Sequence, residues 1–124
     1  MKKIGILGGG VWGSALARLF NKSNVCIFAR DEKIVKSIND HKFNPKLKYA
    51  VFNEIVKATL DITDMQKTDY LVIALPSQHI REVLNKYPKK KKNQQVIIAS
   101  KGIEIETKLL LNDVVRRLIN SENI

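Results

Sequence analysis

Glycines are concentrated at one junction near the start of the chain. Four of the six glycines lie within residues 8–13, which read GGGVWG, and an apolar run at residues 3–7 leads directly into them. The run shows no polar alternation and predicts a short buried strand, whereas residues 11–21 show helical spacing. A strand that turns into a helix through glycines is therefore predicted at residues 3–21.

The spacing of these glycines is G-x-G-x-x-G, at Gly8, Gly10 and Gly13. In a strand–turn–helix unit the first glycine allows a sharp turn, the second lets a diphosphate approach the backbone, and the third lets the helix pack closely on the strand. The helix would direct its unpaired N–H groups and the positive end of its dipole at the anion. We therefore predict a dinucleotide site. The alternative is a tight turn without a ligand, because the spacing alone is a weak signal.

The rest of the chain alternates between strand-like and helix-like segments. Unbroken apolar runs predict further strands at residues 25–28, 56–59, 70–75 and 95–99. Helical spacing predicts helices at 11–21 (with Ala15, Leu16, Leu19 and Phe20 on one face), at 32–40, at 77–87 with Ser77 as N-cap, and from about Thr107. Residues 41–55 show no clear period. This order predicts one α/β domain over residues 1–124: a Rossmann-type, doubly wound, mostly parallel sheet with helices on both faces.

Composition narrows the possible classes of protein. The net charge is +10, and five of the 22 basic residues are arginines, which leaves 17 lysines. We interpret the densest basic run, at residues 88–95, as a solvated connection, with nucleic-acid binding as the alternative. The single Cys26 excludes an internal disulfide, fits a cytoplasmic protein, and is interpreted as a small buried hydrophobe. We expect no signal peptide, no membrane span, no metal site and no nucleic-acid partner.

The end of the second predicted strand bears on the choice of cofactor. It reads FARDE, with Arg30 followed by Asp31. An acidic side chain there would bind the ribose 2′-OH of NAD, whereas an arginine can accommodate the 2′-phosphate of NADP. Either side chain could point into the site. We expect NADPH to be preferred over NADH, on the strength of Arg30.

A lysine lies at another predicted strand end, where ligands of such sheets bind. Lys101 follows the strand at 95–99 and precedes Gly102, which permits an unusual backbone turn. It could hold a phosphate or polarise a carbonyl. On the residues alone, an exposed lysine in a lysine-rich chain is an equally good interpretation.

Four stretches, taken in order, resemble one family, the NAD(P)-dependent glycerol-3-phosphate dehydrogenases. They are GGGVWGSALA (8–17), ATLDI (58–62), ALPSQHIREVL (74–84) and ASKGIEIET (99–107). The resemblance implies a Rossmann domain that binds NAD(P). It also implies reversible hydride transfer between NAD(P)H and dihydroxyacetone phosphate, which yields sn-glycerol 3-phosphate for phospholipid synthesis.

Carried over residue by residue, the resemblance implies roles for particular side chains. The residues that would contact the dinucleotide are Gly8, Gly9, Gly10, Val11, Trp12, Gly13, Arg30 (at the adenosine end), Pro76 and His79 (beside the nicotinamide half), and Lys101, which would also touch the substrate. Val11 stands where the family usually has serine or asparagine, so a side-chain hydrogen bond to phosphate is missing while the backbone N–H remains. The segment FNPKLKY (43–49) keeps the family pattern poorly.

The resemblance also implies a division of labour between two domains. Family members carry a second, helical domain that supplies the lysine acting as proton donor and most of the substrate contacts. We expect this chain to be the cofactor-binding domain, without a catalytic residue of its own, and to turn over little or no substrate alone. A homodimer is the candidate assembly of the full-length protein. The alternatives are a ketopantoate or imino-acid reductase, a stand-alone nucleotide-sensing module, and a basic nucleic-acid binder.

Overall fold

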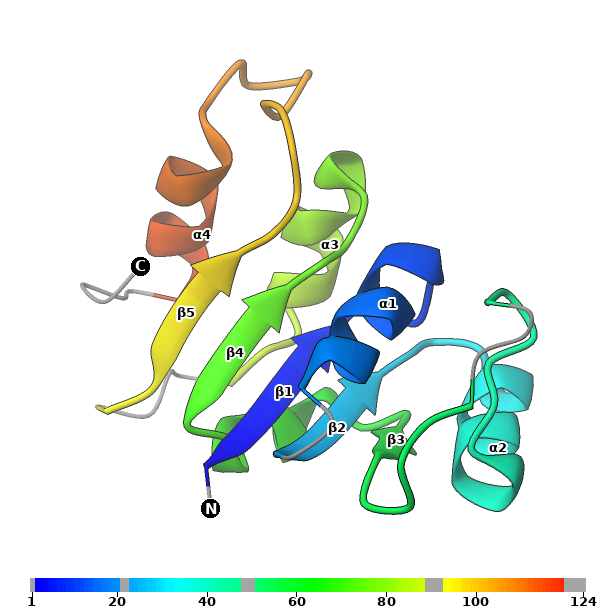
Figure 1. The fold of residues 1–124 in the computed structure, drawn as a ribbon. Coiled ribbons are helices and arrows are strands. Elements are labelled where there is room, and N and C mark those ends of the chain that lie inside the picture. Colours follow the sequence, from blue (N-terminus) through cyan, green and yellow to red (C-terminus); the bar gives the residue numbers. More distant parts are fainter. Residues whose placement is uncertain (1, 21–22, 48–50, 89–92, 120–124) are drawn as a thin grey trace.

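The computed structural model describes residues 2–20, 23–47, 51–88 and 93–119, and these form one layered α/β domain (Figure 1). The strands are β1 (Lys3–Leu7), β2 (Asn24–Phe28), β3 (Lys57–Thr59), β4 (Tyr70–Ile73) and β5 (Gln95–Ile98). The helices are α1 (Val11–Leu19), α2 (Glu32–His41), α3 (Ile80–Leu84) and α4 (Leu111–Ile119), with 3-10 helices η1 (Ile62–Lys67) and η2 (Ser77–His79). All five predicted strands are present, each shifted by no more than two residues at either end.

The strands form a single sheet in the order β3-β2-β1-β4-β5, and every neighbouring pair is parallel. Leu7 at the end of β1 is level with Phe28 on β2 and with Ile73 on β4. The carboxyl ends of the strands therefore meet at one edge of the sheet. The chain runs outward from β1 in both directions, so a topological switch point lies between β1 and β4, where doubly wound sheets bind ligands.

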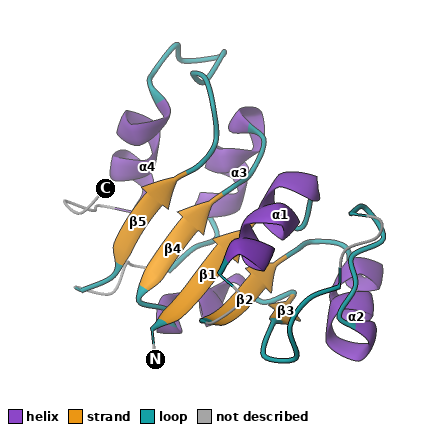
Figure 2. Ribbon diagram, in the orientation of Figure 1, coloured by secondary structure: helices purple, strands orange, loops and turns teal. Residues whose placement is uncertain are grey.

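Helices lie on both sides of this sheet (Figure 2), and two clusters of buried apolar residues cover its opposite faces. Successive strand residues point to opposite faces, so Ile6 belongs to one cluster and its neighbour Leu7 to the other. One face packs against buried residues of α1 and α2, and the other against η1, α3 and α4. Strands buried on both sides explain why the apolar runs in the sequence are unbroken rather than alternating. The predicted fold class is confirmed.

The buried face of α1 differs from the predicted one. Leu19 is 75% exposed, and the fully buried residues of the helix are Gly13, Ser14 and Ala17. The cause is the close approach of α1 to the sheet: a Cβ added at Gly13 would overlap the carbonyl oxygen of Gly8. Small residues therefore face the strands, while the bulky Leu16 and Phe20 are only partly buried.

The predicted N-cap of one helix and the predicted start of another were also wrong. Pro76, not Ser77, occupies the N-cap position before η2, and no side chain caps that end. The last helix begins at Leu111 instead of near Thr107, because Lys108 adopts a left-handed φ of 60° and the carbonyl oxygen of Leu109 accepts from the Glu104 amide. The connection before α4 is therefore a looped segment, and Leu110 is exposed.

Candidate functional site

A pocket of about 670 Å³ lies along the carboxyl ends of the strands. Its walls come from the loops that follow β1, β2, β4 and β5, together with Ile34 of α2 and Lys46. Nine of the ten predicted site residues line it: Gly8, Gly9, Gly10, Val11, Trp12, Arg30, Pro76, His79 and Lys101. Gly13 is buried beneath the pocket and does not line it. Lys46 was missed because its segment shows no periodicity.

The glycines of the turn have distinct structural roles. Gly8 has a φ of 137°, and a Cβ there would lie 2.6 Å from the carbonyl oxygen of Ala74, so both its conformation and its surroundings require glycine. Gly13 allows α1 to approach the sheet, as described above. Gly10 differs from both, because no atom lies within 4 Å of the position that its Cβ would take. Space is therefore left open in front of the Gly10 backbone.

The N-terminus of α1 opens onto this space. Gly10 is its N-cap residue, has an extended backbone, and provides no side-chain hydrogen bond to the first turn. The first intrahelical bond of this end is the one from the Ser14 amide to the Gly10 carbonyl oxygen, at 3.1 Å. The amides of residues 11–13 lack an intrahelical acceptor, as at any helix start. Uncapped N–H groups beside an open cradle suit an anion such as a diphosphate.

Asn44 stabilises the glycine turn through side-chain hydrogen bonds. Its side chain is fully buried and donates to the carbonyl oxygen of Gly9, at 2.9 Å, and to the hydroxyl of Ser14, at 2.6 Å. Its own oxygen accepts from the Lys46 amide at 3.0 Å. Asn44 thus joins the irregular segment after α2 to both the turn and the first helix. It lies in the stretch that keeps the family pattern poorly, and no local signal pointed to this role.

Trp12 connects the glycine turn with the far side of the pocket. Its indole N–H donates to the carbonyl oxygen of Ala99, just beyond β5, at 2.9 Å. The residue is nevertheless 53% exposed. Its indole therefore has a fixed hydrogen bond at one edge, and the residue lines the pocket in the first turn of α1.

The two candidate cofactor-selecting side chains after β2 are both engaged. The carboxylate of Asp31 accepts from the Lys33 amide at 2.9 Å and so caps α2. The guanidinium of Arg30 donates to the carboxylate of Glu82, on α3, at 2.8 Å. The hydrogen bond from Arg30, with a smaller contribution from His79 3.6 Å away, lowers the pKa of Glu82 below its ordinary value of 4.5. Glu82 is therefore ionised at neutral pH.

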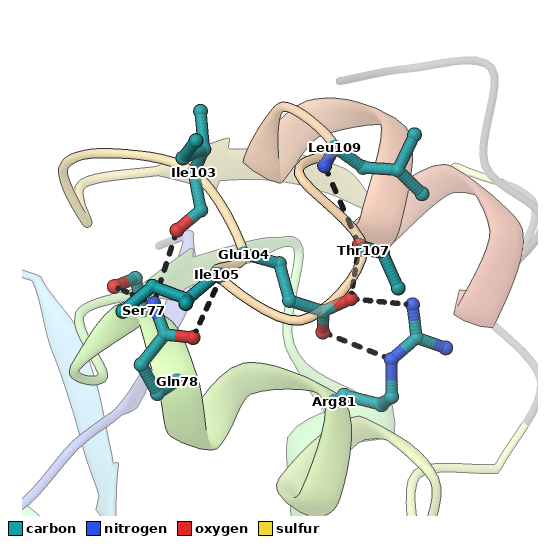
Figure 3. Close-up of polar contacts among 8 residues, drawn as sticks. All are labelled: Ser77, Gln78, Arg81, Ile103, Glu104, Ile105, Thr107 and Leu109. Carbon is teal, nitrogen blue, oxygen red and sulfur yellow. Dashed lines mark hydrogen bonds and ion pairs between the residues drawn. The ribbon is translucent and has the colours of Figure 1, made fainter.

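Lys101 belongs to the long loop between β5 and α4. Further along this loop, Ile103, Glu104 and Ile105 are bonded to residues of η2 and α3 (Figure 3). The Gln78 amide nitrogen donates to the Ile103 carbonyl oxygen and its oxygen accepts from the Ile105 amide, both at 3.0 Å. Arg81 makes two hydrogen bonds of 2.9 Å to the buried Glu104 carboxylate. These bonds lower the pKa of Glu104 below 4.5.

Within the loop, Lys101 itself is exposed and precedes Gly102, whose φ is 102°. Among the described residues its ammonium group has no hydrogen-bond or ion-pair partner. The loop therefore presents the Lys101 ammonium group at the pocket wall, while Ile103, Glu104 and Ile105 of the same loop bond to Gln78 and Arg81.

Other side chains considered from the sequence lie away from this pocket. Burial raises the pKa of the Cys26 thiol from 9.0 to about 11, with a smaller contribution from Asp64, so it is protonated at neutral pH. His41 ends α2 and is exposed. The lysines at 89–92 lie outside the described residues. Over the described ranges no cluster of three potential metal ligands occurs, and no helix has the length and apolar character to cross a membrane.

Comparison with known proteins supports one family. The family model described as NAD-dependent glycerol-3-phosphate dehydrogenase N-terminus matches residues 3–124. The chain is 36% identical over 123 residues to a glycerol-3-phosphate dehydrogenase [NAD(P)+] of Neorickettsia sennetsu, covering 96% of this chain and 37% of that protein. The chain thus spans little more than a third of the length of this relative.

Solved structures agree on the fold. A glycerol-3-phosphate dehydrogenase from Coxiella burnetii superposes with a TM-score of 0.85 at 24% identity, over 97% of this chain and 38% of that one. A Ralstonia solanacearum protein assigned as a ketopantoate reductase gives a TM-score of 0.66 at 21% identity, over 83% of this chain and 33% of that one. Both structures share the fold of this chain, and the Coxiella burnetii protein has the higher TM-score.

Proposed function

Since the chain belongs to the family of NAD-dependent glycerol-3-phosphate dehydrogenases, whose N-terminal model it matches over residues 3–124, we propose that its pocket binds NAD(P) for that reaction. The diphosphate would lie against the backbone of Gly9, Gly10 and Val11. The observation that carries this proposal is the empty space in front of Gly10, at an uncapped helix start. An open space beside uncapped amide groups at a helix start suits a bound anion.

Other pocket residues would position the two ends of the dinucleotide. Pro76 and His79 would lie beside the nicotinamide half. Trp12 would contact the dinucleotide, and its hydrogen bond to Ala99 limits the freedom of its indole. Lys101 would hold an anionic group of the cofactor and of a phosphorylated triose. When bound, NAD(P)H supplies the hydride for reduction of dihydroxyacetone phosphate. The role of this chain is then to orient both partners, because hydride transfer requires near-attack geometry.

We further propose that NADPH is preferred over NADH. Arg30 lies at the pocket wall after β2, where the ribose of a dinucleotide is expected. Its guanidinium can form bidentate bonds with a 2′-phosphate. Asp31 is a weaker candidate for binding a ribose hydroxyl, because its carboxylate caps α2.

The second domain, the location and the assembly of the full-length protein are further proposals. We expect a helical substrate domain that supplies the proton donor, a cytoplasmic location and a homodimer. These remain predictions. Light scattering and fractionation of the full-length protein would test the last two.

The decisive experiment places a methyl group in the open space in front of Gly10. Gly10→Ala should unfold at nearly the wild-type temperature, because the added Cβ meets no atom within 4 Å and the backbone there is extended. It should nevertheless lower the affinity for both NADH and NADPH at least tenfold in calorimetric titrations. Leu19→Ala, on the same helix but outside the pocket, is the control and should leave affinity unchanged. Wild-type binding by the Gly10→Ala chain would refute the proposed diphosphate position.

A further inference from the structure

The cofactor-selecting arginine already has an anionic partner. Arg30 follows β2 and Glu82 lies on α3, yet one guanidinium nitrogen is 2.8 Å from one carboxylate oxygen. The other oxygen of Glu82 is 3.6 Å from Nδ1 of His79. A hollow of about 380 Å³ beside the main pocket is lined by Arg30, Glu82 and Lys86 among others. Glu82 is thus an acidic group that binds Arg30 and lies near His79, in a hollow that Lys86 also lines.

We propose that Glu82 is a specificity-determining residue, which competes with a ribose 2′-phosphate for Arg30 and so restrains the preference for NADPH. This inference rests on the proposed function of the pocket. NADH carries a neutral 2′-hydroxyl and leaves the Arg30–Glu82 pair intact. NADPH brings a phosphate of charge near −2, which must displace the carboxylate or share the guanidinium with it. The charge of Glu82 therefore opposes only one of the two cofactors.

The strength of this effect follows from the exposure of the pair. Arg30 and Glu82 have side chains that are 49% and 56% exposed, so water and salt screen their attraction and their repulsion of other charges. Exposed pairs of this kind are worth a factor of roughly two to five in an equilibrium constant. Glu82 should accordingly moderate the cofactor preference without abolishing NADPH binding.

The test is a titration of the chain with NADH and NADPH separately, before and after Glu82→Gln. We expect the substitution to raise the affinity for NADPH about three- to fivefold and to change that for NADH less than 1.5-fold. Glu54→Gln removes the same charge from an exposed residue outside both hollows and should leave the ratio of affinities unchanged. Equal gains for both cofactors, or no gain for NADPH, would overturn the proposal. A wild-type chain that binds neither nucleotide would instead defeat the proposed function.

A second background separates competition for Arg30 from simple repulsion. In Arg30→Gln, no guanidinium remains to be released, so adding Glu82→Gln should raise the affinity for NADPH less than twofold. If the full gain persists without Arg30, Glu82 acts directly on the phosphate, and the proposed competition is wrong.

Discussion

The side-chain amide of Asn44 donates a hydrogen bond of 2.9 Å to the main-chain oxygen of Gly9. The same nitrogen donates to Ser14, so one buried side chain restrains the glycine turn and the first turn of α1 together. Glycines lose more conformational freedom on ordering than any other residue. A turn built from three of them in succession therefore gains rigidity from a buried contact of this kind.

Asn44→Ala should weaken both stability and binding. Removing the amide takes this partner from the part-buried Gly9 carbonyl oxygen and from the buried Ser14 hydroxyl, which costs about 1–3 kcal/mol of unfolding free energy. A looser turn should also lower dinucleotide affinity. Urea unfolding and calorimetry measure the two effects. Asn85→Ala, an exposed asparagine at the end of α3, is the control. If Asn44→Ala and Asn85→Ala are equally stable, the hydrogen bonds of Asn44 contribute nothing to stability.

Gly13→Ala should destabilise the fold, in contrast to the same change at Gly10. The added methyl group would overlap the Gly8 carbonyl oxygen, which cannot move without disturbing the turn. Overpacking of this kind costs about 1–3 kcal/mol or more. Unfolding by urea, followed by circular dichroism, should show a lower midpoint for Gly13→Ala and a nearly unchanged one for Gly10→Ala. The reverse order would contradict the packing of α1 described here.

The strands and the glycine turn could be predicted because their signals are local. A strand buried on both faces reads as an unbroken apolar run, and the pocket follows once parallel strands share one edge. Asn44 could not be found in this way, because residues 41–55 have no period and its partners lie 35 and 30 residues away. The Arg30–Glu82 pair is also non-local. It depends on the strand order, which brings segments 52 residues apart together.

The Arg81–Glu104 pair should make the stability of the Lys101 loop depend on pH. The pKa of Glu104 is lower in the folded chain than its ordinary value of 4.5, chiefly because Arg81 donates to the carboxylate, so its ionised form favours folding. This contribution is complete above pH 4.5 and is lost as the pH falls through the lowered value. The melting temperature of the wild type should therefore be higher than that of Glu104→Gln at pH 7, and this difference should shrink at pH 3.

Carbon-detected NMR titration of the Glu104 carboxyl group checks the cause directly. The midpoint should lie below 4.5 in the wild type and move towards 4.5 in Arg81→Gln. The carboxylate of Glu104 bonds to Arg81 and Thr107 and not to the side chain of Lys108, on the same loop, so Lys108→Gln should leave the midpoint in place. If the Glu104 midpoint is the same in the wild type and in Arg81→Gln, the predicted acid sensitivity has no basis.

Lys101 offers a test of whether local placement or overall charge attracts the dinucleotide. If its ammonium group binds a phosphate of the cofactor, Lys101→Gln should lower the affinity for NADPH about tenfold, the loss expected for one hydrogen bond to a charged group. Replacing all four lysines at residues 89–92 by glutamine removes four times the charge. Because we interpret that run as a solvated connection, the replacement should change affinity less than twofold in 0.15 M salt, which screens exposed charges. A greater loss from the four-lysine change than from Lys101→Gln would mean that the general positive field, rather than the loop after β5, supplies the attraction.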